Sequence, residues 1–318
     1  MKLSNVVDDS GLVQKMNNIC GTTNVIFSNK AKVSNINDAL DRYFFLASQS
    51  NSSGSIDDSN RAASPIETQN IVSGTNYYKF SDFTNEILDV LQLGILDDAA
   101  EETTLTHETL ENIGNFGDYY DTSDTGTPTH WIRLGDFIYL RPCPNYSETG
   151  GLRAYVGRIP ERYAFTSFTV TIASPGVFSA TAHGLSKGDA LILETDGALP
   201  TGLTADTVVY YVITAGYTAD AFQVSTTNSL TGTAVNTSGS QSGNHTFLKV
   251  SKSPGIPSIH HLYLARYASL PYLIEKNLPQ KNSIAALIQE DERSIIKYFS
   301  YRDKDTRSRI INRGVSFR

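Results

Sequence analysis

Six histidines are the first residues to test for metal or acid–base chemistry. His260 and His261 are adjacent, and adjacent residues on a helix diverge by about 100°, so one helix face cannot bring both to a single metal ion. We expect each of them to pack or to form a hydrogen bond near a helix start. His183, in "AHGLSKGD", is expected to be a turn residue. The remaining histidines have no partner at a metal-ligand spacing: His107, His130 and His245.

Clustered carboxylates are the second candidate. In "GDYYDTSDTG", Asp118, Asp121 and Asp124 are three residues apart. A calcium loop needs oxygen ligands at alternate positions and a Glu near its end, and this segment has neither. Two other acidic runs are Asp57-Asp58 and Glu290-Asp291-Glu292. No sequence pattern indicates that either run lies beside another carboxylate. We therefore expect all of these groups to be solvated side chains.

No catalytic motif is present in the chain. It has no Gly-x-Ser-x-Gly elbow, phosphate-binding loop, dinucleotide fingerprint or His-Glu-x-x-His sequence. The two cysteines, Cys20 and Cys143, are far apart and are expected to be free, buried thiols in a reducing cytoplasm. These observations favour a binding or structural role, and we expect no enzyme activity, no cofactor and no metal.

The charge distribution is uneven. The net charge of −7 argues against a nucleic-acid-binding protein that works through a general basic face. The last segment, "YRDKDTRSRIINRGVSFR", is basic, with only Asp303 and Asp305 as acidic residues. It is either a frayed end or an arm that orders on an acidic partner. Its basic residues are Arg302, Lys304, Arg307, Arg309, Arg313 and Arg318.

The elements that position these groups begin and end with helices. In "SNINDALDRYFFLASQS" the apolar residues follow one helix face, with Ser34 or Asn35 as the expected N-cap. A second helix is expected from about Ser258, kinked or broken at Pro271, and a third from Ser283 to Arg302. The N-terminus has no apolar stretch typical of a secretory signal, and no run is long enough to span a membrane.

Strand patterns fill the region between these helices. "ETQNIVSGTNYYKF" predicts a hairpin around Ser73-Gly74, and "NEILDVLQLGIL" predicts a strand. "HWIRLGDFIYLRP" predicts a hairpin with a Gly135-Asp136 turn. "GGLRAYVGRIP" predicts a strand with three residues on one face: Leu152, Ala154 and Val156.

From about Phe165 the composition changes to Thr, Val, Ser, Ala and Gly, with few charges. Six short apolar runs separated by turn residues predict a small all-β sandwich or barrel. They are "FTVTIA", "GVFSAT", "DALILET", "VVYYVIT", "AFQVSTT" and "HTFLKV". We call residues 164–246 the β module and interpret it as an insertion.

The expected fold class is therefore α+β: a helical and antiparallel-sheet host domain with an inserted all-β domain and an extended C-terminal arm. The host domain should comprise residues 1–163 and 247–302, interrupted by the β module at 164–246 and followed by the arm at 303–318.

The order of the host elements resembles head-to-tail adaptor (connector or neck) proteins of tailed bacteriophages. The similarity covers most of the host domain and has no catalytic motif. The segments that carry the resemblance are "NDALDRYFFLASQS", "PIETQNIVSGTNYYKF", "GTPTHWIRLGDFIYLRPCPN", "GLRAYVGRIP" and "PGIPSIHHLYLARYA", before a closing helix and basic tail.

The resemblance implies a virion structural protein at the head–tail junction, assembled in the bacterial cytoplasm. Its copies would form a ring, commonly of twelve subunits, docked beneath the portal protein and joined to a downstream neck or tail protein. DNA would pass through the channel without sequence-specific binding, and no membrane would be involved. The C-terminal arm would reach the portal through Arg302, Lys304, Arg307, Arg309, Arg313, Phe317 and Arg318.

Two alternatives remain open. The Thr- and Tyr-rich β module also suits a phage surface or carbohydrate-binding tail protein, with the rest of the chain as its mount. A more distant alternative is a tail-associated hydrolase that uses the loop carboxylates between Asp118 and Asp124.

Overall fold

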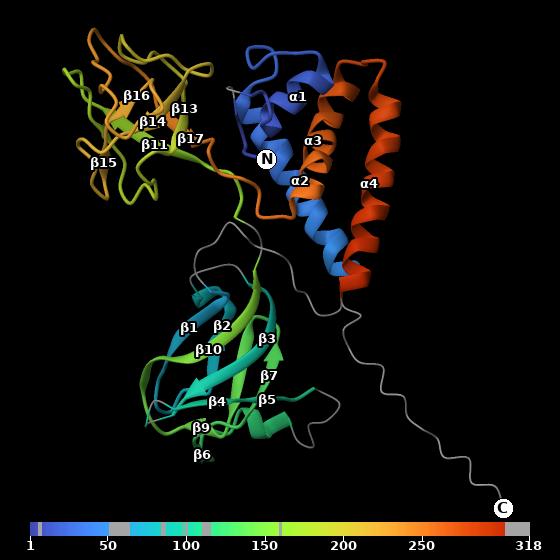
Figure 1. Cartoon of the computed structure of the whole chain (residues 1–318). Helices are drawn as coiled ribbons and strands as arrows, with labels where there is room; N and C mark the ends of the chain where they lie inside the picture. The colour runs from blue at the N-terminus through green and yellow to red at the C-terminus, as the bar shows by residue number, and fades with distance from the viewer. Residues whose placement is uncertain are drawn as a thin grey trace, which may run out of the picture. The chain divides into compact units, whose positions relative to one another are not determined.

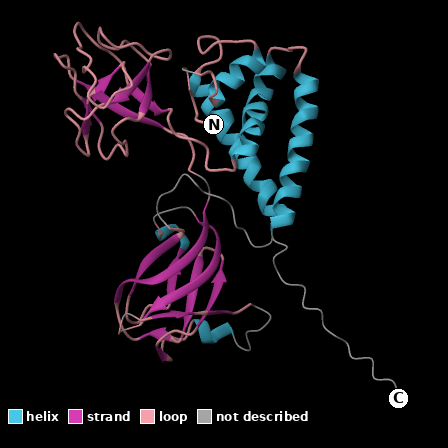
Figure 2. Cartoon of the chain, viewed as in Figure 1, coloured by secondary structure: helices cyan, strands magenta, loops and turns pink. Residues whose placement is uncertain are grey.

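The computed structural model confirms an α+β fold with a nearly closed, barrel-like sheet. It describes residues 1–5, 8–50, 64–83, 87–97, 99, 101–109, 116–158 and 161–302. Figures 1 and 2 show the helices and the separate groups of strands.

The chain divides into two compact units. The helix–barrel unit comprises Met1–Leu46 and Pro160–Lys297, and the sheet unit comprises Ala47–Ile159 and Tyr298–Arg318. The β module therefore groups with the helices, whereas the expected host domain placed the helices with the sheet. The four expected domain ranges stay a prediction.

Four helices are present among the described residues: α1 (Leu12–Cys20), α2 (Asn29–Ser50), α3 (His261–Glu275) and α4 (Lys281–Arg302). The expected N-cap of α2 at Ser34 or Asn35 is wrong, because the helix starts earlier. Ser28 Oγ accepts a hydrogen bond from the Ala31 N–H at 3.3 Å, which satisfies one of the free donors of the first turn. The buried Val33 extends the apolar face toward this start.

Helix α3 follows the 3₁₀ turn η3 (Ser258–His260) and packs on α1. Pro271 lies inside α3 without ending it, and the helix continues to Glu275. Next to the proline, the rings of Tyr272 and Phe27 stack with centroids 4.5 Å apart. This contact stabilises the turn where the missing proline N–H removes a helix hydrogen bond.

Two half-buried ion pairs join α4 to the other helices. Arg266 of α3 contacts Asp291 at 2.7 Å, and Arg42 of α2 contacts Glu292 at 2.8 Å. The expectation of a solvated face at 290–292 is therefore wrong for Asp291 and Glu292. Their partners come from distant parts of the chain, so the local charge run did not reveal them.

The β module forms one seven-stranded sheet, in the order β15-β12-β11-β17-β13-β14-β16. All six predicted strand segments are confirmed, and the last strand passes the expected boundary at residue 246. The strands are β11 (Phe165–Val170), β12 (Phe178–Ser179), β13 (Ala190–Thr195), β14 (Val209–Val212), β15 (Ala221–Phe222), β16 (Val224–Ser225) and β17 (His245–Lys249).

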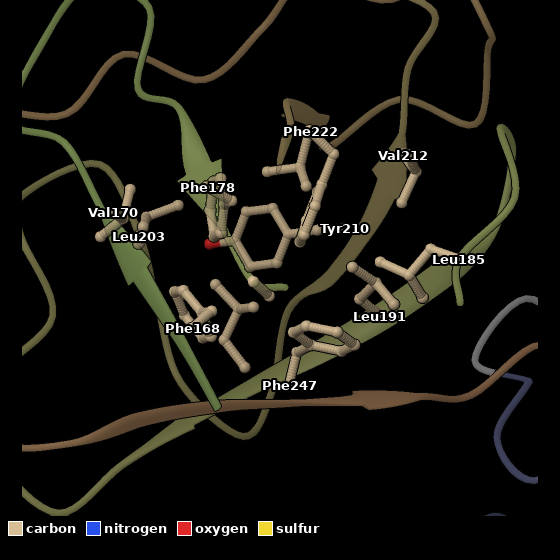
Figure 3. Close-up of a cluster of buried hydrophobic side chains, with 13 residues drawn as sticks. Phe168, Val170, Phe178, Leu185, Leu191, Leu203, Tyr210, Val212, Phe222 and Phe247 are labelled. Atoms are coloured by element: carbon tan, nitrogen blue, oxygen red, sulfur yellow. The ribbon is translucent and has the colours of Figure 1, made fainter. Parts of the chain in front are cut away.

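The inward side chains of these strands meet in one aromatic-rich core (Figure 3). Phe222 lies at its centre, stacked on Phe178 at 5.2 Å and edge-on to Phe247 at 5.6 Å. His183, which directly follows the turn at Thr181 and Ala182, packs against the same ring at 5.0 Å. This core holds the strands of the module together.

The sheet unit contains two four-stranded sheets, in the orders β1-β10-β3-β4 and β2-β8-β7-β5. A third, two-stranded sheet is made of β6 and β9. The strands are β1 (Ile66–Ile71), β2 (Tyr77–Lys79), β3 (Ile87–Leu96), β4 (Glu102–Thr104), β5 (Thr106–His107), β6 (Thr125–Gly126), β7 (His130–Leu134), β8 (Phe137–Arg141), β9 (Cys143–Pro144) and β10 (Glu148–Arg158).

The Gly135-Asp136 hairpin is confirmed: Leu134 pairs with Phe137, and Gly135 has a positive φ of 59°. The hairpin predicted around Ser73-Gly74 is wrong, because β1 pairs with β10 while β2 pairs with β8. Residues of both larger sheets share one core, so the turn connects two sheets. The expectation of a purely antiparallel sheet also fails, since β5–β7 and β6–β9 are parallel pairs.

We expect Phe222→Ala to reduce the free energy of unfolding of the β module by about 3–5 kcal/mol, because it leaves a cavity among packed rings. Ile172→Ala removes a side chain that is 47% exposed and should change it by less than about 0.5 kcal/mol. Urea denaturation followed by tyrosine fluorescence measures both. Equal effects of the two substitutions would contradict this assignment of the core.

Candidate functional site

The predicted arm begins at the end of α4, and Arg302 is the last residue of that helix. The other residues predicted to form the arm lie outside the described residues: Lys304, Arg307, Arg309, Arg313, Phe317 and Arg318. The arm therefore stays a prediction, attached directly to a helix.

His260 and His261 are buried and hydrogen-bonded, as the sequence predicted. The Tyr43 hydroxyl lies 2.8 Å from His260 Nδ1. The amino group of Met1 donates to His261 Nδ1 at 2.7 Å, which leaves Nε2–H of the same ring to donate to the Ile256 carbonyl at 2.9 Å. Burial lowers the pKa of both imidazoles, because the charged form loses its hydration. These histidines tie the start of α3 to α2 and to the N-terminal segment.

The acidic segment 118–124 does not form a site. Asp118 pairs with Arg141 at 3.3 Å, and Asp121 accepts a hydrogen bond from the Ser123 N–H at 2.8 Å. Within the described ranges, no three His, Cys, Asp or Glu side chains are grouped as a metal site requires. Asp57 and Asp58 lie outside the described residues.

The two cysteines are free and buried, as predicted. Burial raises the pKa of both thiols, so the nucleophilic thiolate is disfavoured. Neither cysteine has the properties of a reactive site.

A groove of about 790 Å³ runs along the β module, between β11, β12 and the loop before β17. Ser167, Thr169 and Ser179 place hydroxyls on the outer face of the sheet, since their neighbours Phe168 and Phe178 point into the core. Other polar groups in the groove are already engaged: Asp220 accepts the Ala182 N–H at 2.7 Å, and Gln241 donates to the Val170 carbonyl at 2.9 Å. The groove can offer hydroxyls to a polar ligand.

A second cluster lies where the β module meets the start of α2. Glu194 of β13 is only 4% exposed, and its Oε2 lies 3.7 Å from Lys30 Nζ. The Asn29 side-chain amide donates to the Asp206 carbonyl at 3.3 Å. Among the described residues, Glu194 Oε1, Asn29 Oδ1 and Thr246 Oγ1 are buried without a hydrogen-bond partner.

Burial and the nearby Asp206 carboxylate raise the pKa of Glu194 to about 7, and Lys30 only partly opposes them. The ordinary pKa is 4.5, so folding favours protonation of Glu194 by about 3 kcal/mol relative to the unfolded chain. Because the folded-state pKa is the higher one, this stabilisation is complete below the unfolded value and is lost as the pH rises through about 7.

Sequence reasoning missed this cluster. Glu194 is the charged residue in "LILET", where alternation leaves one strand face to solvent. One of its charged neighbours, Lys30, comes from a helix more than a hundred residues earlier in the chain. No local pattern could have identified Lys30 or Asn29 as its neighbours.

The chain matches no protein-family model, and a sequence search finds no curated protein that it matches. None of the helices among the described residues combines the length and the apolar character of a bilayer-crossing segment.

We expect His260 and His261 to lower the free energy of unfolding as the pH decreases below 6.5, the ordinary histidine value, because both must be charged on unfolding. Glu194 contributes in the opposite direction over this range, so the histidine contribution is read from the difference between the wild type and His260→Gln. Between the unfolded and the folded pKa of each histidine, the free energy of unfolding should change by about 1.4 kcal/mol per pH unit, and we call this change the slope. His260→Gln should make this slope smaller, whereas the exposed His107→Gln should leave it unchanged. Denaturation curves at pH 5 to 7 measure it, and an unaltered slope in His260→Gln would argue against the assignment.

Proposed function

We propose that this protein is a head-to-tail adaptor of a tailed bacteriophage. Copies would form a ring, of twelve subunits by the resemblance, that docks under the portal, joins the capsid to the tail and continues the DNA channel. The protein would be a virion structural component without enzymatic activity. The observation that carries this proposal is the basic segment that directly follows α4 in an otherwise acidic chain.

The charge of that segment supports a role in binding. Residues 302–318 contain six basic and two acidic residues, while the whole chain has a net charge of −7. A basic extension from an acidic body is attracted to an acidic surface on another protein and can order on it. The acidic body is compatible with a channel through which DNA slides, because like charges do not adhere.

An apolar surface at one end of the helices supports assembly into a ring. Val25 is 81% exposed, Ile26 68% and Ile274 58%. Ile26 lines a hollow of about 290 Å³ together with Phe27 and Tyr272. Exposed large apolar side chains beside a hollow suit an interface between proteins, and a neighbouring copy would bury them.

The test uses the full chain and the portal protein encoded in the same genome. Arg307→Glu, Arg309→Glu and Arg313→Glu together should weaken portal binding by at least about a hundredfold, because attraction becomes repulsion at three positions. The matched control reverses three exposed charges elsewhere: Arg133→Glu, Lys187→Glu and Arg293→Glu. Biolayer interferometry gives the affinities.

Electron microscopy of the wild-type complex should show a ring on the portal. A protein that stays monomeric with the portal, or an arm variant that binds as well as the control, would refute the adaptor proposal.

A second candidate function is recognition of a surface saccharide by the β module, favoured by the hydroxyl-lined groove. In that case Thr169→Trp, which fills the groove, should abolish binding of maltotriose, cellotriose or chitotriose in saturation-transfer NMR. Thr226→Trp, at an exposed position outside the groove, should retain it. Absence of a signal from all three sugars with the wild-type protein would remove this candidate.

A further inference from the structure

We propose that a hollow on the sheet unit binds a proline-rich, acidic peptide segment of a partner protein. The hollow has a volume of about 530 Å³, and we call it the aromatic pocket because four rings line it: Tyr77, Tyr120, Phe137 and Tyr139. Among the described residues, Lys79 is the one charged side chain of its lining. The inference concerns the sheet unit alone and does not depend on the adaptor function.

Strand pairing places the aromatic pocket on the outer face of β2 and β8. Tyr77 is the register partner of Tyr139, and Lys79 is the register partner of Phe137. Ile138, between Phe137 and Tyr139, is buried in the core of the sheet unit. Because side chains alternate along a strand, the two cross-strand pairs lie together on the opposite, outer face.

Tyr120 adds a wall to the pocket from outside the sheet. It directly follows the 3₁₀ turn η2 (Phe116–Tyr119), and its ring lies edge-on to Tyr139 with the centroids 5.3 Å apart. Tyr77 is 51% exposed and Tyr120 is 55% exposed, so about half of each side chain remains open. Large aromatic side chains left open around a hollow are typical of a binding site.

The spacing of the rings matches that of a polyproline II helix. The ring centroids of Tyr77, Phe137 and Tyr139 are 6.0 to 6.3 Å apart. A polyproline II helix rises about 3.1 Å per residue, so every second residue lies about 6.2 Å further along its axis. The planes of the three rings are inclined to one another by 42° to 69°, and none of these pairs is a parallel stack. Proline rings can therefore pack against ring surface that the tyrosines and the phenylalanine leave open.

The polar groups of the pocket are mainly hydrogen-bond donors. The Lys79 ammonium only donates, and the half-exposed Tyr77 can donate its hydroxyl to a carbonyl. The side-chain amide of Asn76, which also lines the pocket, already donates to the Tyr119 carbonyl at 2.6 Å. A proline segment complements such a lining, because it has carbonyl acceptors and no N–H donors. A saccharide brings hydroxyl donors instead, and no carboxylate is present among the described lining residues to accept them.

The charge of Lys79 favours an acidic residue beside the prolines. The Lys79 Nζ lies over the Phe137 ring, 5.6 Å from its centroid. Within the part of the chain that the structure describes, no carboxylate lies within ion-pair distance of Lys79. A glutamate or an aspartate at one end of the proline segment can pair with this ammonium. Nucleic acids suit the pocket less well, because their binding depends on neutralising several phosphates.

The experiment measures the binding of synthetic peptides to the full-length protein by isothermal titration calorimetry, and amide NMR shifts locate the site. The probe is a peptide of eight prolines followed by two glutamates. It should shift the amides of β2 and β8. The same peptide with alanine in place of proline should bind at least about tenfold more weakly, because it does not present the proline rings. No binding of the proline peptide, or equal binding of both peptides, would overturn the proposal.

A pair of tyrosine substitutions tests the place of binding. Tyr77→Ala should weaken the binding of the proline peptide at least about tenfold, because it removes one of the ring contacts. The matched control is Tyr155→Ala, on β10 of the other large sheet, where the hydroxyl donates to Glu102 at 2.7 Å. This variant should bind as the wild type does. Thermal melts confirm that both variants are folded, and wild-type affinity in Tyr77→Ala would refute the pocket.

Charge reversal tests the acidic residue. The wild type should bind the glutamate peptide about two- to fivefold more tightly than a peptide with two lysines in the same places, and Lys79→Glu should reverse this preference. A wild type that binds both peptides equally would contradict the proposal. Displacement of the proline peptide by cellotriose or by a thymine oligonucleotide would assign the pocket to a saccharide or to a nucleic acid and would also overturn it.

Discussion

The pairing of β11 with β17 is the contact on which the organisation of the helix–barrel unit depends. Phe165, at the start of the module, is the register partner of Leu248, near its end. The two points where the module joins the rest of the chain are therefore neighbours within one sheet. A domain with adjacent ends can be inserted into a loop without separating the elements on either side. Adjacent ends of this kind are what the predicted insertion of residues 164–246 requires.

The nearly closed sheet also determines what the module presents to its surroundings. Its inward positions are filled by aromatic and aliphatic side chains, so its polar residues lie mainly on the outer face (Figure 3). Part of that face bears the hydroxyls of the groove. Another part carries Glu194, which is almost fully buried and lies 3.7 Å from Lys30 at the start of α2, although strand alternation assigns this residue to the outer face.

Electrostatics connects the elements of the helix–barrel unit in two different ways. The pairs Arg266–Asp291 and Arg42–Glu292 are close, half-buried contacts between helices and join opposite charges. At Glu194 the repelling Asp206 is not balanced by Lys30, so the protonated state is favoured. The first arrangement stabilises one geometry across the neutral pH range, whereas the second makes the free energy of unfolding depend on pH.

The accuracy of the sequence predictions follows the range of the interactions involved. The Gly135-Asp136 hairpin and all six strand segments of the module were predictable, because turn residues and alternation act over a few positions. The Ser73-Gly74 hairpin was not, because β10 and β8 competed for its two strands from more than fifty residues away. The start of α2 was misplaced for a smaller reason: Ser28 accepts the capping hydrogen bond about two turns before the expected cap.

The sequence by itself determined the α+β class, the change of composition near Phe165, the buried cysteines and the basic end of the chain. These depend on composition and on short periods, which a single strand or helix expresses locally. Only the tertiary structure decided that the β module groups with the helices, that Asp291 and Glu292 have arginine partners, and that Glu194 is buried beside Asp206. Burial and charge pairing depend on which distant parts of the chain lie next to a residue, and the local sequence around that residue does not identify them.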